Sequence, residues 1–91
     1  MNIYGTRDLG AAARQKRESL GLTQQAVADA AGVSREWLIG FEAGKPGVSL
    51  SRVFTVLNTL QLALDLSDAE VDEDTTLDDV FAALDRPWPA T

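Results

Sequence analysis

The chain has 91 residues with 8 basic and 14 acidic side chains, and its formal net charge of -6 is opposite to the basic excess typical of a DNA-binding domain. It holds no cysteine and no histidine, which excludes disulfides and thiolate metal sites and removes the commonest metal ligand and general base. No apolar run approaches the roughly 18 residues of a membrane span, and a chain this short buries only about 60–65% of its unfolded surface, so that it gains stability from a partner subunit.

The charge is distributed unevenly along the chain. Residues 1–66 carry seven basic and six acidic side chains, a net charge of +1. Residues 67–91 carry eight acids against one base, Arg86, a net charge of -7. The sequence therefore divides into a near-neutral body, 1–66, and an acidic tail, 67–91. The body can offer a basic face even though the whole chain is acidic.

Helical spacing of apolar residues predicts a first helix over about 7–19, which Gly21 ends. The inner face of this helix is expected to contain Leu9, Ala12, Ala13, Lys16 and Leu20. Thr23 is suited to cap a second helix that extends to about Ala31. Gly32 then suits the left-handed backbone of a tight turn between two helices.

Two further helices are predicted after this turn. Ser34 caps the third, which ends at Gly44. The turn KPGVS follows, and Ser49 or Ser51 begins the fourth helix. The residues expected to face inward are Leu38 and Phe41 in the third helix and Leu50, Val53, Phe54, Leu57 and Leu60 in the fourth.

The period of the leucines changes after the fourth helix. In LQLALDL the leucines are two residues apart, which is typical of a strand. A single strand cannot satisfy its own backbone, so we expect it to pair with the same segment of a second copy, with Leu62, Leu64 and Leu66 at the dimer interface. The alternative is that this stretch extends the fourth helix. The predicted fold is thus all-α, with about four core helices and one short strand that pairs across a dimer.

The acidic tail begins with the linker SDAEVDEDTT and continues with a helix predicted over 76–86. Its apolar stripe consists of Leu77, Val80, Phe81, Leu84 and Trp88. Three interpretations are open: the stripe folds back onto the domain, docks on a protein partner, or leaves the acids to compete with DNA for the basic face. Partner docking is favoured. The acids have calcium-loop spacing, but Glu73 replaces the required glycine, so we expect no metal site.

Residues 23–45, TQQAVADAAGVSREWLIGFEAGK, have the spacing of a helix-turn-helix motif. Ala28 has to be small where the two helices cross, and Gly32 accepts the turn. The wedge between the helices consists of Val27, Val33, Leu38 and Phe41. On these residues the sequence resembles the Xre/Cro helix-turn-helix family, and within it the HipB-like antitoxins. The resemblance covers about residues 3–68, and the leucine-alternating segment is its HipB-like part.

This resemblance implies a cytoplasmic repressor that binds a palindromic operator in double-stranded DNA as a homodimer. It implies further that the protein regulates its own operon and, as the antitoxin of a HipBA-like type II toxin–antitoxin system, neutralises a HipA-like serine kinase toxin. A stand-alone Xre-family regulator without a toxin is the alternative. We expect no enzymatic activity, no cofactor and no membrane association, because the sequence offers no set of side chains suited to catalysis.

The resemblance also implies roles for individual residues near the motif. Gln24 matches a glutamine that holds a DNA phosphate, and Lys45 suits a second backbone phosphate. Arg17 and Glu42 match a structural salt bridge between the first and third helices, with a phosphate contact by Arg17 as the second interpretation.

The start of the third helix carries the residues expected to meet bases, namely Ser34, Arg35, Glu36 and Gly40. Arg35 is the first choice for a bidentate contact to guanine, while Glu36 accepts from a cytosine amino group or orients Arg35. Trp37 either covers a thymine methyl or a sugar, or braces neighbouring helices. Gly40 lacks the side chain that relatives use to reach bases, so readout would depend more on Arg35 and on DNA shape.

Overall fold

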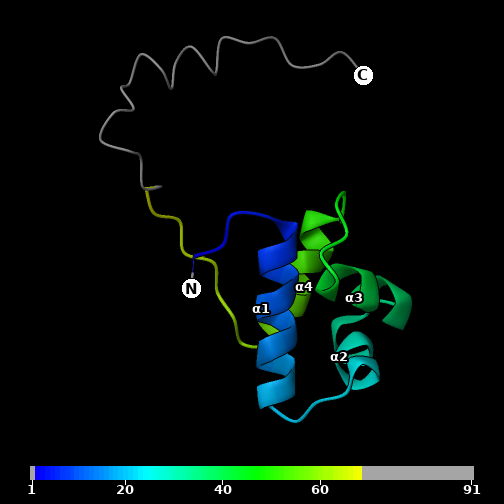
Figure 1. Cartoon of the computed structure of the whole chain (residues 1–91). Coiled ribbons are helices and arrows are strands. Elements are labelled where there is room, and N and C mark those ends of the chain that lie inside the picture. Colours follow the sequence, from blue (N-terminus) through cyan, green and yellow to red (C-terminus); the bar gives the residue numbers. More distant parts are fainter. Residues whose placement is uncertain (1, 69–91) are drawn as a thin grey trace, which may run out of the picture.

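A computed structural model describes residues 2–68, which form four α-helices and contain no strand (Figure 1). The helices are α1 (Thr6–Ser19), α2 (Gln24–Ala31), α3 (Arg35–Glu42) and α4 (Leu50–Thr59). α3 packs against both α1 and α2, and α2 also packs against α4. The predicted all-α fold with four core helices is confirmed. The predicted helix at 76–86 lies outside the described residues, together with its apolar stripe.

The starts of α2, α3 and α4 are set by local hydrogen bonds. Thr23, Ser34 and Ser49 each accept a hydrogen bond at the side-chain oxygen from the backbone N–H three residues ahead, at 3.0, 3.0 and 3.4 Å. Such a cap stabilises a helix by about 1 kcal/mol. The two alternatives for the start of α4 are thereby decided in favour of Ser49.

Each of the four described helices is followed within two residues by a residue with a left-handed backbone. After α1, α2 and α3 this residue is a glycine, but after α4 it is Gln61, with φ 59°. The N–H of Gln61 donates to the carbonyl of Asn58 at 3.0 Å, and that of Leu62 to the carbonyl of Leu57 at 2.8 Å. These bonds close α4, so the alternative of one continuous helix through the leucine run is wrong. A left-handed backbone costs a residue other than glycine roughly 1–2 kcal/mol, so a glutamine is not expected at such a position. The sequence therefore carries no local signal that α4 stops here.

The hydrophobic core lies between the four helices and consists of Ala13, Val27, Ala28, Ala31, Leu38, Phe41, Val53, Val56, Leu57 and Leu60. Two of the residues expected to face inward on α4 do not: Leu50 is 64% and Phe54 43% exposed, and Val56 is buried instead. Leu20 is also exposed, because it lies beyond the end of α1. The inner face of α1 is therefore narrower than its apolar pattern predicts.

The segment after Gln61 leaves α4 and lies beside the N-terminal residues and α1 (Figure 1). Leu62 packs against the core of its own chain, whereas Leu64 is 41% and Leu66 99% exposed. Leu62 is thus partly buried by its own chain, whereas Leu64 and Leu66 remain free to contact another surface. Pairing of this segment with a second copy stays a prediction. None of the four helices described has the length and apolar character needed to cross a bilayer.

Candidate nucleic-acid interface

A tight turn sets the direction of α3 relative to α2. Gly32 adopts φ 70° and ψ 29°, which a glycine accepts without the crowding that a side chain would meet. The N–H of Val33 returns to the carbonyl of Ala28 at 3.0 Å. Ala28 and Leu38 are fully buried, so the inner sides of the two helices are in the core. The first residues of α3 are consequently presented to solvent.

The residues expected to contact bases lie on this presented surface. Ser34, Arg35 and Glu36 are exposed at the start of α3, and Gly40 is half-buried further along the helix. Lys45 is exposed just after the helix. Glu36, Trp37, Gly40 and Lys45 line a pocket of about 360 Å³, so the structure brings them together on one side of α3. Arg35, although exposed on the same turn of α3, is not among the residues that line this pocket.

Trp37 has a packing role in this structure. Its ring stacks on that of Phe41, with 5.4 Å between the centroids and an interplanar angle of 24°. It is half-buried and packs against the hydrophobic core. Because it also lines the pocket beside α3, part of its surface remains open to solvent.

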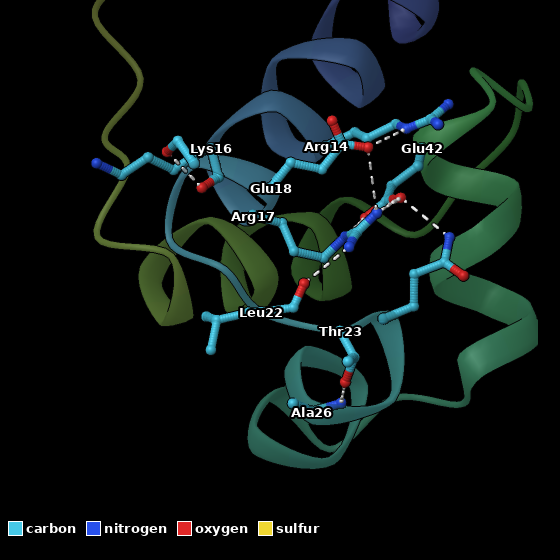
Figure 2. Close-up of polar contacts among 10 residues, drawn as sticks. Arg14, Lys16, Arg17, Glu18, Leu22, Thr23, Ala26 and Glu42 are labelled. Atoms are coloured by element: carbon cyan, nitrogen blue, oxygen red, sulfur yellow. Dashed lines mark hydrogen bonds and ion pairs between the residues drawn. The ribbon is translucent and has the colours of Figure 1, made fainter.

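A buried ion pair connects α1 to the end of α3 (Figure 2). The Nε of Arg17 donates to Oε2 of Glu42 at 2.7 Å, and Nη2 donates to Oε1 at 3.1 Å. The Nη1 of Arg17 donates to the carbonyl of Leu22 at 2.8 Å, in the loop before α2. The expected salt bridge is therefore present, and it also holds the loop that positions α2.

The electrostatics of this pair favour the charged form of Arg17. Its hydrogen bond to Glu42 raises its pKa, which burial opposes and the charges of Glu42 and Glu18 support. A basic group whose pKa is higher in the folded than in the unfolded state contributes stability to the fold. This contribution is fully present below the unfolded pKa and is lost only as the pH rises through the folded pKa. The contribution of Arg17 is therefore present at neutral pH and is lost only in strongly alkaline solution.

Gln24 is linked to the same ion pair. Its Nε2 donates to Oε1 of Glu42 at 3.1 Å, and the residue is half-buried at the start of α2. One of the two N–H bonds of this amide is thus used within the protein, and the other donates no hydrogen bond within residues 2–68. Sequence reasoning assigned Gln24 to phosphate alone, because nothing in the local pattern indicates a partner 18 residues away.

Arg52 was not among the residues that the sequence singled out. It is exposed in the first turn of α4 and lines the same pocket as Lys45 and Gly40. The available signal was its place three residues after the cap Ser49, which puts it near the loop that follows α3. That signal does not belong to the helix-turn-helix motif and gives no reason by itself to choose Arg52.

The geometry of α2, the turn and α3 is that of a helix-turn-helix, and a family model described as "Helix-turn-helix domain" matches residues 8–73. The chain belongs to this family and is, by class, a DNA-binding transcription regulator. A curated relative is an uncharacterized HTH-type transcriptional regulator, y4mF, of Sinorhizobium fredii (strain NBRC 101917 / NGR234). It is 37% identical over 59 residues, which are 65% of this chain and 78% of the relative.

Solved structures are similar over most of the described fold. A chain of the HipA–HipB–O2–O3 complex has a TM-score of 0.72 and 27% identity, covering 77% of this chain and 99% of that one. The HipB–O4 20mer complex has a TM-score of 0.72, 28% identity and the same coverages, 77% and 99%. The restriction-modification controller protein C.AhdI from Aeromonas hydrophila has a TM-score of 0.56 and 29% identity, covering 60% of this chain and 83% of that one. The resemblance to HipB-like antitoxins of the Xre/Cro class is thus confirmed.

Proposed function

We propose that this protein is a sequence-specific repressor and the antitoxin of a HipBA-like toxin–antitoxin system. It regulates its own operon and neutralises a HipA-like serine kinase toxin, acting as a homodimer in the cytoplasm. The proposal rests on the structural similarity of this chain to chains of two solved complexes, the HipA–HipB–O2–O3 complex and the HipB–O4 20mer complex. In both cases the similarity covers 99% of the matched chain. A stand-alone regulator is the second candidate, supported by the transcriptional regulator of Sinorhizobium fredii.

In the proposed complex, α3 enters the major groove of the operator. Arg35 points from its exposed start and reads a guanine through two parallel hydrogen bonds, with Glu36 beside it as an acceptor. The free N–H of Gln24 and the ammonium of Lys45 hold backbone phosphates. A dimer would place two such helices in successive major grooves, so the operator is expected to be a palindrome with half-sites about 34 Å apart.

Replacing Arg35 with alanine tests the recognition helix. We expect a loss of about 1–3 kcal/mol in operator binding and relaxed specificity at one base position, because one bidentate base contact is removed. Titration against the operator and its single-base variants measures both effects. Lys45→Ala is the matched control, since losing a phosphate contact weakens all sequences alike. Unchanged affinity and base preference in Arg35→Ala would show that α3 does not read bases as proposed.

The dimer is tested on the exposed leucines after α4. Leu64→Asp should dissociate it, because the substitution places an unpaired charge in the proposed interface between two copies. Ser67→Asp is the control, since it adds the same charge on the opposite side of an extended segment. Sedimentation at micromolar concentration distinguishes the two variants. A dimer that survives Leu64→Asp rules out pairing through this segment.

The antitoxin role is tested by a chain that ends at Ser67. The removed residues carry a net charge of -7 and the apolar stripe, which we propose docks on the toxin. The shortened chain should remain a dimer and bind operator at least as tightly, most visibly at low salt, where charges are least screened. It should lose affinity for the HipA-like kinase encoded beside it, as measured by calorimetry, and full-length Trp88→Ala should lose part of that affinity.

Other outcomes of this experiment each have a distinct meaning. If the shortened chain unfolds or no longer dimerises, the tail belongs to the core and the docking proposal is wrong. If it binds the kinase as tightly as the full chain, the docking surface lies within residues 1–67. An operon that encodes no such kinase would favour the stand-alone regulator.

A further inference from the structure

Lys45 is held against α3 at the position of Gly40. Its backbone N–H donates to the carbonyl of Gly40 at 2.9 Å. A Cβ added to Gly40 would lie 3.4 Å from Cδ and 3.8 Å from Cβ of Lys45. The methylene groups of Lys45 therefore cover the surface that a larger residue at position 40 would occupy. The side chain of Lys45 thus lies along α3 at Gly40, within van der Waals reach of that position.

Arg52 lines the same pocket from a different helix, α4. The pocket has a volume of about 360 Å³, and both Lys45 and Arg52 line it. Trp37 and Val48 contribute an apolar wall, and Glu36 is the acidic residue in the lining. Within residues 2–68, neither Lys45 nor Arg52 forms a salt bridge. Two cations that form no salt bridge in that part of the chain thus line one pocket beside α3, and the carboxylate of Glu36 offsets one of their two charges.

We propose that Lys45 and Arg52 together hold one phosphodiester group of the DNA backbone in this pocket, an inference that rests on the DNA-binding function proposed above. The ligand is anionic because the lining has a net positive charge. The guanidinium of Arg52 matches the geometry of phosphate oxygens, and the ammonium of Lys45 adds a point charge. A phosphate held here is next to Gly40, where α3 has no side chain to offer a base. At this part of the interface, α3 is therefore positioned on DNA through the backbone.

The test needs no knowledge of the operator, because a phosphate contact is independent of sequence. The full chain and its variants are titrated with a random-sequence duplex of fixed length at several salt concentrations. Each neutralised phosphate contributes about 0.9 to the slope of log affinity against log salt. Lys45→Ala with Arg52→Ala should therefore reduce that slope by about 0.9. The affinity advantage of the wild type should accordingly shrink about three- to fourfold between 50 and 200 mM salt.

Matched variants separate this site from general effects of charge. Arg14→Ala removes the same charge as Arg52→Ala, but from an exposed pair with Glu18 on α1, and it should leave the slope unchanged. Arg52→Lys keeps a cation in the pocket and should retain the slope. Glu36→Gln removes the acid from the lining and should tighten binding to the random-sequence duplex, in which no base contact of Glu36 is selected. Equal melting temperatures show that all of the variants are folded, which is expected for exposed side chains.

The outcomes that overturn the inference are distinct from failure of the proposed function. An unchanged slope in the double variant shows that the pocket holds no phosphate. A decrease of about 1.8 shows that the two cations contact separate phosphates and share none. A wild-type chain that binds no duplex at low salt contradicts the DNA-binding function itself.

Discussion

Replacing Glu42 with alanine should destabilise the domain by about 3–5 kcal/mol, which is a large part of the total stability of a small domain. The side chain of Glu42 is 4% exposed and that of Arg17 is 10% exposed. The carboxylate accepts two hydrogen bonds from Arg17 and one from Gln24. Without it, the guanidinium of Arg17 is left in the interior with no opposite charge from α3. Urea unfolding at neutral pH, followed by circular dichroism, measures the loss.

Two controls identify the cause of this loss. Arg14→Ala breaks an exposed ion pair with Glu18, whose side chains are 62% and 55% exposed, and it should cost less than about 1 kcal/mol. The double variant Arg17→Met, Glu42→Leu removes both buried charges and should recover much of the stability, because paired burial of charge is itself costly. If Glu42→Ala unfolds at the same urea concentration as the wild type, the buried pair does not stabilise the fold as argued.

Replacing Gly10 with alanine should destabilise the domain by about 3 kcal/mol, although alanine is the better helix former by about 1 kcal/mol. Gly10 lies within α1 and is buried against the end of α3. A Cβ at this position would overlap the carbonyl oxygen of Phe41 and lie 3.1 Å from that of Glu42. Both obstacles are backbone atoms, so no side-chain rotation relieves them. Either α1 moves away from α3 or the helices distort.

Gly5→Ala is the matched control for this prediction. Gly5 precedes α1 with an extended backbone at φ -172°, and an added Cβ would meet nothing within 4 Å. Stability should fall by less than about 1 kcal/mol, because alanine is a weaker N-cap than glycine while it restricts the unfolded chain. Thermal melts followed by circular dichroism compare the two variants. A melting temperature for Gly10→Ala equal to or above that of the wild type would contradict the close approach of α1 and α3.

Both substitutions also bear on DNA binding, because they act where α1 meets α3. Gly10 sets the distance between these helices, and the pair of Arg17 and Glu42 locks the end of α3 to α1 and to the loop before α2. The direction of α3 depends on these contacts, and Arg35 is carried at the other end of the same helix. A variant that remains folded but alters this junction should lose operator affinity without a change in any proposed DNA contact.

Much of the interface was predictable because its signals are local. Thr23 and Ser34 cap helices through hydrogen bonds that span three residues, and Gly32 supplies the left-handed backbone of the turn between α2 and α3. The outward placement of Arg35 follows from the position of that turn. By contrast, the pocket shared by Lys45 and Arg52 joins two helices through a loop, and the sequence pattern of either helix alone does not reveal it.

The sequence by itself determined the four helices, their caps and the helix-turn-helix, because these depend on residues within a few positions of one another. Only the tertiary structure decided which residues of each apolar stripe are buried, with Val56 replacing Leu50 and Phe54 in the core. It also decided that the chain turns out of α4 at Gln61 and that Gln24 bonds to Glu42. The reason is physical: burial and side-chain pairing depend on which surfaces the packed helices bring together, and that information is distributed over the whole fold.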